Sequence, residues 1–223
     1  LITPHIVLTA AHCVVIYGYK LGPQEITVGL GKLYRDYYRN ERNANLLMVR
    51  EVVVPERYLG EVHTFALDIA LLDLVDRVRP SSTIHPACLD LTDHFNLIDD
   101  AIGYVAGWGK SNNNKHSEYL LWARQSYLTY QPCFSQIGKQ NWRFLTHDKF
   151  CVIGVNESKI DYGDSGGGLT IIRAGVHFVY GIVSTRAPFE NNPTVLLTDL
   201  TNPGHRLWLN NQCHRLAQNR TMD

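Results

Sequence analysis

Short apolar runs separated by polar turn residues dominate the hydrophobic pattern of this chain. Residues 26–30 alternate between apolar and polar or small positions, which is the period of a half-buried strand. Other runs are apolar and rich in residues that favour strands. Strands are expected within residues 1–11, 26–30, 46–54, 69–74, 104–107, 120–130, 150–153, 169–172, 176–184 and 194–200. Many short strands with turns between them predict an all-β fold built from a pair of barrels or sandwiches.

Helical spacing of apolar residues is confined to the end of the chain. It follows the breaker sequence Asn202-Pro203-Gly204. Residues 34–45 are polar and charged and indicate an exposed loop, and residues 92–100 form a polar connector between two halves. The expected units are therefore about 1–91, about 101–204 and a C-terminal helix at about 205–217.

Composition and charge exclude several classes of partner. The chain has 223 residues, with 21 basic and 21 acidic side chains. This balance gives no electrostatic reason to expect nucleic acid or an anionic membrane as a partner. No uncharged apolar run is long enough to cross a bilayer. Asp36 and Glu41 lie in a loop that would suit calcium, but no ligand spacing is evident. We therefore expect no metal and no cofactor.

The cysteines indicate an oxidising compartment. There are five of them, without the CxxC spacing of a zinc site: Cys13, Cys88, Cys133, Cys151 and Cys213. An odd number suggests disulfides plus a partner outside this sequence, and hence secretion. Sequons at Asn156 and Asn219 are candidate glycosylation sites and fit the same compartment. The chain lacks an initiating methionine and opens inside a predicted strand, so we expect a fragment without its N-terminus.

Three short segments carry the residue types of acyl-transfer chemistry. They are Thr9-Ala10-Ala11-His12-Cys13, Asp68-Ile69-Ala70-Leu71-Leu72 and Gly163-Asp164-Ser165-Gly166-Gly167. A serine hydroxyl is a weak nucleophile at neutral pH, so an imidazole must take its proton and later return it to the leaving group. A buried carboxylate fixes the imidazole tautomer and offsets its positive charge. The chain order His, Asp, Ser is one of the known orders for such a triad.

Each segment also has a simpler interpretation. A glycine-rich turn with a serine fits an ordinary hairpin, His12 is one of ten histidines, and Asp68 fits a strand-end cap. A lipase or esterase on an α/β sheet would need the order Ser, acid, His and a strand–turn–helix elbow, and both are lacking. The joint occurrence of the three segments favours the triad of His12, Asp68 and Ser165.

The three segments resemble the trypsin/chymotrypsin-like serine protease family, and the likeness extends over nearly the whole chain. Further landmarks are Gly107-Trp108-Gly109, the pair Phe150-Cys151, the segment Gly181-Ile182-Val183-Ser184 and the closing Trp208-Leu209. The resemblance implies two six-stranded antiparallel β-barrels with a C-terminal helix and the triad at the barrel junction. It implies His12 as general base, Asp68 as its orienting partner and Ser165 as nucleophile.

The resemblance also implies the supporting roles around this triad. Backbone N–H groups of Gly163 and Ser165 would form the oxyanion hole, and Ser184 would lie close to Asp68 and begin the strand that pairs with substrate. Asp164 would receive the new N-terminus that cleavage creates. Cys133 and Cys151 would form a disulfide, whereas Cys13 and Cys88 would pair with upstream residues. Cys213 has no obvious partner.

The specificity pocket departs from the family pattern. Lys159 stands where trypsin-like members carry an aspartate. It would either attract an acidic side chain, or turn to solvent or pair with Asp161 and contribute nothing to specificity. Arg186 and Thr194 replace pocket glycines. Asp161 occupies a position of the usual pocket disulfide, which is absent and would contribute on the order of 2–4 kcal/mol of constraint. We therefore expect poor cleavage of simple trypsin or chymotrypsin peptides.

Two functions from different classes remain. The first is a secreted serine endopeptidase of restricted specificity in a zymogen cascade such as innate immunity. Its partners would be a protein substrate, itself a zymogen, and upstream regulatory modules linked through Cys88. More loosely, residues 30–36, 85–89 and 166–168 are similar to insect modular serine proteases of immune cascades. The second function is a catalytically weak homologue that acts as a binding cofactor, which the unusual pocket favours and the complete triad disfavours.

Overall fold

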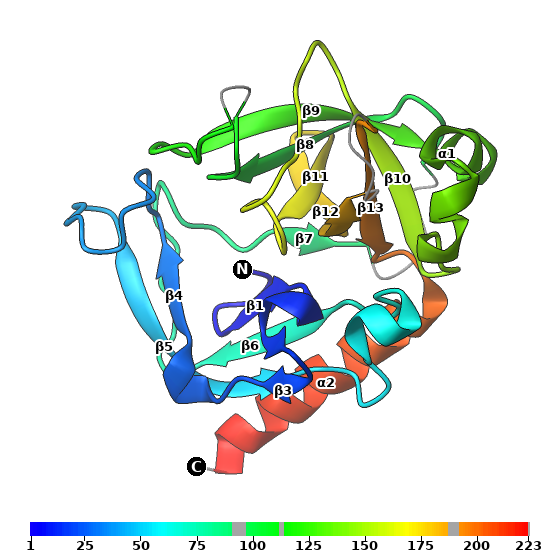
Figure 1. The fold of residues 1–223 in the computed structure, drawn as a ribbon. Helices are drawn as coiled ribbons and strands as arrows, with labels where there is room; N and C mark the ends of the chain where they lie inside the picture. The colour runs from blue at the N-terminus through cyan, green and yellow to red at the C-terminus, as the bar shows by residue number, and fades with distance from the viewer. Residues whose placement is uncertain (91–96, 112–113, 187–191, 223) are drawn as a thin grey trace.

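The computed structural model describes residues 1–90, 97–111, 114–186 and 192–222 of the chain. Two mainly antiparallel sheets, one open and one closed into a barrel, make up most of the structure (Figure 1). The first sheet has the strand order β1-β6-β5-β4, and we call it the half-barrel. Its strands are β1 (Ile6–Thr9), β4 (Thr27–Leu30), β5 (Asn45–Val53) and β6 (Ala70–Leu74), and a separate hairpin pairs β2 (Val15–Ile16) with β3 (Tyr19–Lys20).

The second sheet closes on itself. Its strand order is β11-β8-β9-β10-β13-β12-β7, and β11 also pairs with β12, so that six strands form a closed barrel. The strands are β7 (Cys88–Leu89), β8 (Ile102–Gly107), β9 (Leu121–Leu128), β10 (Lys149–Gly154), β11 (Gly168–Arg173), β12 (Val176–Arg186) and β13 (Thr194–Asp199). The short β7 lies within the expected first unit but joins β12 of the barrel in parallel. The all-β prediction is thus confirmed, whereas the first of the two implied barrels is a half-barrel in the described chain.

Two α-helices and four 3₁₀ turns complete the described part of the chain. The helices are α1 (Tyr130–Ile137) and α2 (Pro203–Met222), and the turns are η1 (Ala11–Cys13), η2 (Pro23–Glu25), η3 (Gly60–His63) and η4 (Lys139–Phe144). The prediction that only the chain end is helical is wrong, because the strand expected over 120–130 ends at Leu128 and α1 follows. A helix of eight residues is too short to give a clear 3.6-residue pattern.

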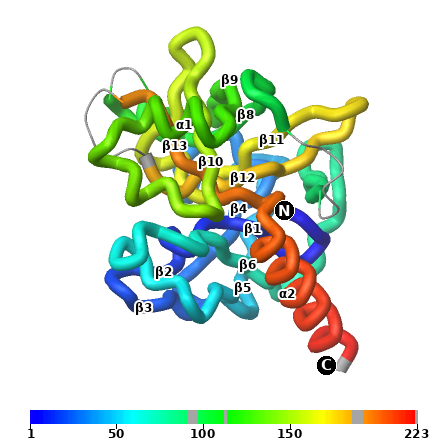
Figure 2. The backbone as a smooth tube through the Cα atoms, turned by 90° about the vertical axis from the view of Figure 1, so that its right-hand side faces the viewer, coloured from blue at the N-terminus to red at the C-terminus, as the bar shows by residue number. Residues whose placement is uncertain are grey.

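The closing helix α2 is longer than predicted. It begins at Pro203, where a missing N–H costs nothing because the first helical N–H groups have no intrahelical acceptor. It leaves the end of the barrel and runs along the half-barrel (Figure 2). At its far end, Arg220 Nη2 lies 2.5 Å from Oδ1 of the fully buried Asp73 of β6. This ion pair holds the last turns of α2 in place.

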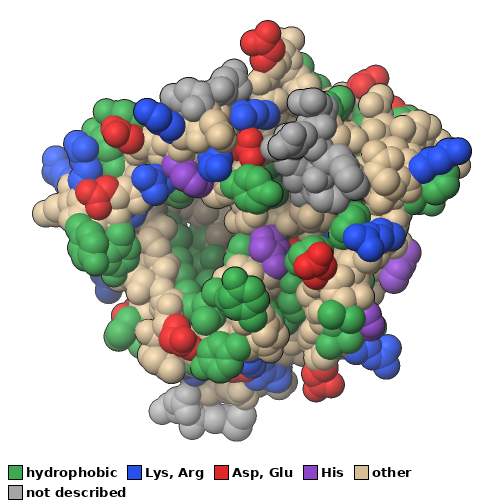
Figure 3. Space-filling view, in the orientation of Figure 1, with side chains coloured by type: hydrophobic (Ala, Val, Ile, Leu, Met, Phe, Trp, Pro, Cys, Tyr) green, Lys and Arg blue, Asp and Glu red, His purple; other side chains and the backbone are tan. Residues whose placement is uncertain are grey.

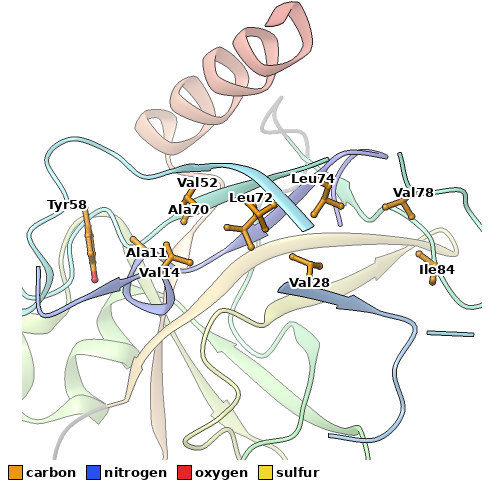
Figure 4. Close-up of a cluster of buried hydrophobic side chains, with 11 residues drawn as sticks. Ala11, Val14, Val28, Val52, Tyr58, Ala70, Leu72, Leu74, Val78 and Ile84 are labelled. Atoms are coloured by element: carbon orange, nitrogen blue, oxygen red, sulfur yellow. The ribbon is translucent and has the colours of Figure 1, made fainter. Parts of the chain in front are cut away.

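Separate apolar clusters fill the two sheets and the space between them. The half-barrel cluster includes Val28, Val52, Leu72 and Leu74, which come from β4, β5 and β6 and point toward one another (Figure 4). A second cluster joins β1 and β6 to Leu209 and Leu216 of α2, and others fill the closed barrel and the space under α1. The space-filling view shows a hollow with largely apolar walls between the half-barrel and the barrel (Figure 3).

A disulfide joins Cys133 of α1 to Cys151 of β10, the pairing that the resemblance implies. Both cysteines are completely buried. We expect the double variant Cys133→Ala/Cys151→Ala to lose about 3 kcal/mol of unfolding free energy, because the bridge closes a loop with a sequence separation of 18 residues. Denaturant unfolding measures this loss. Reduction of the parent protein should reproduce it, and a loss below about 1 kcal/mol would show that the bridge does not constrain the unfolded chain.

Candidate active site

The pairing of β1 with β6 brings His12 and Asp68 together. These strands are antiparallel and Thr9 lies opposite Ala70, so the residues that follow β1 meet those that precede β6. His12 sits in η1 and Asp68 ends the loop before β6. His12 Nδ1 lies 2.8 Å from Asp68 Oδ2, and the His12 backbone N–H donates to Asp68 Oδ1 over 2.8 Å. Two contacts to one carboxylate fix both the position and the orientation of the imidazole.

Asp68 is fully buried, and its charge is compensated by hydrogen bonds from both halves of the molecule. Ser184 Oγ of β12 donates to Asp68 Oδ2 over 2.5 Å. The register of β12 against β13 shifts between Val183 and Thr185, so Ser184 lies at a bulge that turns it toward the half-barrel. Thr198 Oγ1 of β13 donates to the Asp68 carbonyl over 2.8 Å. The carboxylate thus accepts hydrogen bonds from His12 and Ser184, and the backbone carbonyl of the same residue is held by Thr198.

Ser165 lies in an exposed turn that packs against η1. The turn is attached to β12, because the Gly166 N–H donates to the Val183 carbonyl over 2.9 Å. A Cβ on Gly166 would overlap Thr9 Oγ1 and would lie 3.1 Å from Cys13 Sγ, which shows how closely the two segments approach. Within the described chain, the Ser165 hydroxyl and the N–H groups of Gly163 and Ser165 make no hydrogen bond. The hydroxyl and both N–H groups are therefore available to another molecule.

The other nitrogen of His12 does not contact Ser165 in this arrangement. His12 Nε2 lies 3.6 Å from Cys13 Sγ. Burial lowers the pKa of His12. Hydrogen bonds to Asp68 and Cys13 have the opposite and larger effect, and the pKa is raised to about 10. This shift favours the protonated imidazole. The imidazole must lose this proton and turn Nε2 toward Ser165 before it can act as a base.

Asp164, next to the serine, turns away from it toward a separate pocket. Its carboxylate accepts hydrogen bonds from the Gly109 and Asp161 N–H groups, over 2.9 and 3.1 Å. A Cβ on Gly107 or Gly109 would overlap this carboxylate, which explains the two glycines of the Gly-Trp-Gly landmark. The pocket has a volume of about 400 Å³, and its lining includes Asp164 and Lys159.

Lys159 adopts the second of the two arrangements that the sequence leaves open. Its Nζ lies 3.0 Å from Asp161 Oδ2, and it lines the pocket of Asp164. Thr194 is fully buried on β13, and its Oγ1 has no hydrogen-bond partner among the residues that the structure describes. Arg186 ends β12, but its side chain lies outside the described part of the chain, as do residues 187–191. The described residues therefore define only part of the expected specificity pocket.

Among the remaining predicted residues, Cys13 lies beside the Ser165 turn, with its Sγ 3.6 Å from His12 Nε2. Cys13, Cys88 and Cys213 are free thiols: Cys88 is exposed on β7, and Cys213 of α2 packs against the apolar cluster between α2 and the half-barrel. Asn156 is exposed in the turn after β10, and Asn219 is partly buried in the last turns of α2. Neither position brings a further group to the candidate site.

Several residues around His12 and Asp68 could not be expected from the sequence. The Phe65 ring meets the His12 ring edge to face, with centroids 6.2 Å apart. Thr198 reaches the Asp68 carbonyl, and Asp148 and Lys149 lie beneath the loop that carries Asp68. Strand alternation places Thr198 on an inner face, but no local signal marks the other three, because their contacts cross from one sheet to the other.

Comparison with known proteins agrees with this geometry. A protein-family model described as Trypsin matches residues 1–200. The chain belongs to the trypsin family. Within that family it is similar to a modular serine protease from Drosophila melanogaster, with 31% identity over 222 residues that cover 92% of this chain and 33% of that protein.

Two further relatives have names that refer to clotting and melanization. Clotting factor C from Tachypleus tridentatus is 29% identical over 73% of this chain and 16% of its own length. Melanization protease 1 from Drosophila melanogaster is 31% identical over 77% of this chain and 45% of its own length. This trypsin-family chain thus spans a third or less of the first two relatives and is a serine protease domain. Among the described helices, none is long and apolar enough to cross a membrane.

Proposed function

We propose that this trypsin-family domain hydrolyses peptide bonds with Ser165 as nucleophile, His12 as general base and Asp68 as the partner that orients His12. The observation that carries the proposal is the buried Asp68 carboxylate, which binds His12 twice and Ser184 once. A structural aspartate would not need an imidazole that is partly open to solvent as its main partner. The His12 side chain is 22% exposed.

Acylation begins when deprotonated His12 Nε2 accepts the Ser165 hydroxyl proton. Ser165 Oγ then forms a bond to the carbonyl carbon of the substrate, and the carbonyl oxygen becomes an oxyanion. The free N–H groups of Gly163 and Ser165 stabilise this oxygen. Gly163 has a φ of +103°, a conformation that suits glycine and directs its N–H out of the local hydrogen-bond pattern. His12 next gives its proton to the leaving amine, the C–N bond breaks, and an acyl-enzyme remains.

Deacylation repeats the same proton transfers with water. His12 removes a proton from a water molecule, whose oxygen attacks the ester carbon, and then returns a proton to Ser165 Oγ as the ester bond breaks. The Asp68 carboxylate offsets the imidazolium charge in both steps. The hydrogen bond from Ser184 keeps Asp68 Oδ2 directed at His12 Nδ1.

The pocket next to Asp164 supports a role in activation. In this proposal, an amine created by cleavage upstream enters the 400 Å³ pocket and pairs with the Asp164 carboxylate. The carboxylate now accepts two backbone N–H groups, so a cationic amine would add the ion pair that the site lacks. Because Asp164 is adjacent to Ser165, this pairing would also fix the nucleophile turn.

The bond preference follows from the pocket residues. We propose that Lys159, Ser184, Arg186 and Thr194 bound the substrate site, with Ser184 beginning the strand that pairs with substrate. The ion pair between Lys159 and Asp161 neutralises both charges, so the described residues favour neither an acidic nor a basic side chain. Restricted specificity would then depend on contacts outside the primary pocket.

The relatives support a place in a proteolytic cascade. The printed names of three of them refer to a modular protease, a clotting factor and a melanization protease. We propose that this domain is secreted, acts on another protease precursor, and carries upstream modules linked through Cys88, which is exposed on β7. Cys13 would pair upstream as well, and Asn156 and Asn219 would carry glycans.

A catalytically weak homologue that binds a cascade partner is the second candidate. Two observations favour it. His12 Nε2 is directed at Cys13 Sγ and not at Ser165, and the charge of Lys159 is neutralised by Asp161. Both features also fit a protease whose activating amine is not in place. A test must therefore use the full-length protein after cleavage at its activation site.

Labelling with a fluorophosphonate probe separates the two candidates. We expect the activated full-length protein to be labelled covalently at Ser165, because the probe reacts only with a serine that a neighbouring base activates. Mass spectrometry of the labelled peptide identifies the residue, and Ser165→Ala is the matched control. No labelling of the folded, activated parent would reject the protease and favour the binding homologue.

A further inference from the structure

The loop that carries Asp68 has an unusual backbone. We define the Asp68 loop as residues 64–67, which join η3 to Asp68. Three of its side-chain-bearing residues have positive φ angles: Thr64 at 53°, Phe65 at 57° and Leu67 at 60°. Residues other than glycine seldom adopt this left-handed region, and a run of them persists only where the surrounding structure holds it. Something outside the loop must therefore fix its shape.

A lysine and an aspartate from the barrel provide these contacts. Lys149 Nζ donates to the carbonyls of Phe65 and Thr64, the latter over 3.4 Å. Asp148 Oδ2 accepts the Leu67 N–H over 2.7 Å. Lys149 begins β10 of the other sheet and Asp148 directly precedes it, and only 7% of Lys149 and 1% of Asp148 is exposed. Every one of the three strained residues is thus hydrogen-bonded to this pair of opposite charges.

The same loop touches the catalytic imidazole. The Phe65 ring packs with the apolar cluster around the disulfide of Cys133 and Cys151, and its edge meets His12 at an interplanar angle of 77°. Asp68 follows the loop directly. A shift of the loop would therefore move the carboxylate and the ring that flanks His12 together.

We propose that Lys149 and Asp148 are positioning residues for the reaction: they hold the Asp68 loop against the barrel and thereby place His12 and Asp68 relative to Ser165. This inference rests on the proposed function. Buried charges are costly unless they are paired and hydrogen-bonded, and an apolar residue would fill the same space with less desolvation. A lysine here provides donors to two loop carbonyls, which no apolar side chain supplies.

The charges around this contact give the proposal an electrostatic signature. Lys149 donates to the Thr146 hydroxyl and interacts electrostatically with Asp148 and Asp68. His205 Nε2 lies 3.4 Å from Asp148 Oδ2 without hydrogen-bond geometry. His12 faces Asp68, Cys13 and the uncharged Phe65 ring. Burial lowers the pKa of Lys149, whereas Asp148 and Asp68 raise it. Lys149 interacts electrostatically with Asp68, the carboxylate that pairs with His12, so we expect removal of the lysine charge to raise the pKa of His12.

The test compares Lys149→Met with the parent in activated full-length protein. We expect kcat to fall about 10- to 100-fold while KM changes less than about threefold, because the reacting groups are misplaced and the substrate contacts remain. We also expect the acid limb of the kcat/KM profile to move up by about half a pH unit. A residue that only stabilises the fold would not move this limb.

Arg220→Met is the matched control. Arg220 also pairs with a fully buried aspartate, Asp73, and donates to two backbone carbonyls, but at the far end of α2. The Arg220→Met variant should be less stable than the parent but should keep the parent kcat and the same acid limb of the kcat/KM profile. If Lys149→Met does not fold, Lys149→Gln keeps a donor, removes the charge and carries the same expectations. An unchanged kcat and an unmoved limb in a folded Lys149 variant would overturn the proposal.

A second measurement separates this inference from the proposed function. In a Ser165→Ala background, NMR titration of His12 reports its pKa without any need for activity. An upward shift caused by Lys149→Met supports the positioning contact even if the parent fails to label with fluorophosphonate. No shift there, in a protein that does label, would reject the contact and leave the protease intact.

Discussion

Replacing Asp68 with asparagine is expected to lower kcat about 10⁴-fold, which corresponds to roughly 5.5 kcal/mol of transition-state stabilisation. The Asp68 carboxylate accepts hydrogen bonds from His12 Nδ1, the His12 N–H and Ser184 Oγ. An asparagine has one acceptor oxygen and one amide donor. It therefore favours the tautomer of His12 that carries its proton on Nε2, and this tautomer cannot accept the serine proton.

The pH dependence of this variant has a defined sign. Burial lowers the pKa of His12, but the hydrogen bonds to Asp68 and Cys13 outweigh this effect and raise the folded pKa to about 10. A raised pKa contributes stability that is fully present below the unfolded value near 6.5 and is lost as the pH rises through the folded value. The loss of unfolding free energy in Asp68→Asn should therefore be larger at pH 6 than at pH 10. The acid limb of the remaining activity should move to lower pH.

Steady-state kinetics and denaturant unfolding at several pH values check both expectations. Asp76→Asn is the matched control, because Asp76 is exposed just beyond the end of β6. It should leave kcat and the pH profile unchanged. If Asp68→Asn kept kcat within tenfold of the parent, Asp68 would not be the residue that orients His12.

The variant Gly166→Ala is expected to lose about 2–4 kcal/mol of unfolding free energy and about 100-fold in kcat. Gly166 has a φ of +78°, which costs an alanine about 1 kcal/mol. The new Cβ would also overlap Thr9 Oγ1 and approach Cys13 Sγ to 3.1 Å. Since these atoms flank His12, relief of the overlap must move η1 away from the nucleophile turn.

Gly175→Ala separates the two causes. Gly175 has the same φ of +78°, in the turn between β11 and β12, but a Cβ there would meet nothing within 4 Å. It should lose only about 1 kcal/mol and keep full activity. Thermal or denaturant unfolding together with kcat measures both variants. Equal stability losses in Gly166→Ala and Gly175→Ala would show that a steric clash between the Ser165 turn and η1 does not contribute to the loss.

Much of this fold follows from local pattern. The apolar run at residues 46–54 became β5, and the run at 150–153 became β10, because a strand needs only a few β-favouring residues between turn signals. The helix α1 escaped prediction because its inner face consists of Cys133 and Ile137 alone. The length of α2 also escaped, since the contact that holds its end joins Arg220 to Asp73 across 147 residues.

The sequence by itself determined the chemistry of this protein: the residue types, their order and the glycines around Ser165 indicated a serine protease of the trypsin family. Only the tertiary structure decided how the charged groups are used. It paired Lys159 with Asp161 and buried Lys149 beneath the Asp68 loop, 84 residues from Phe65. The physical reason is that strand pattern and side-chain chemistry are local properties, whereas the burial and the partner of a charge depend on which distant segments the fold brings together.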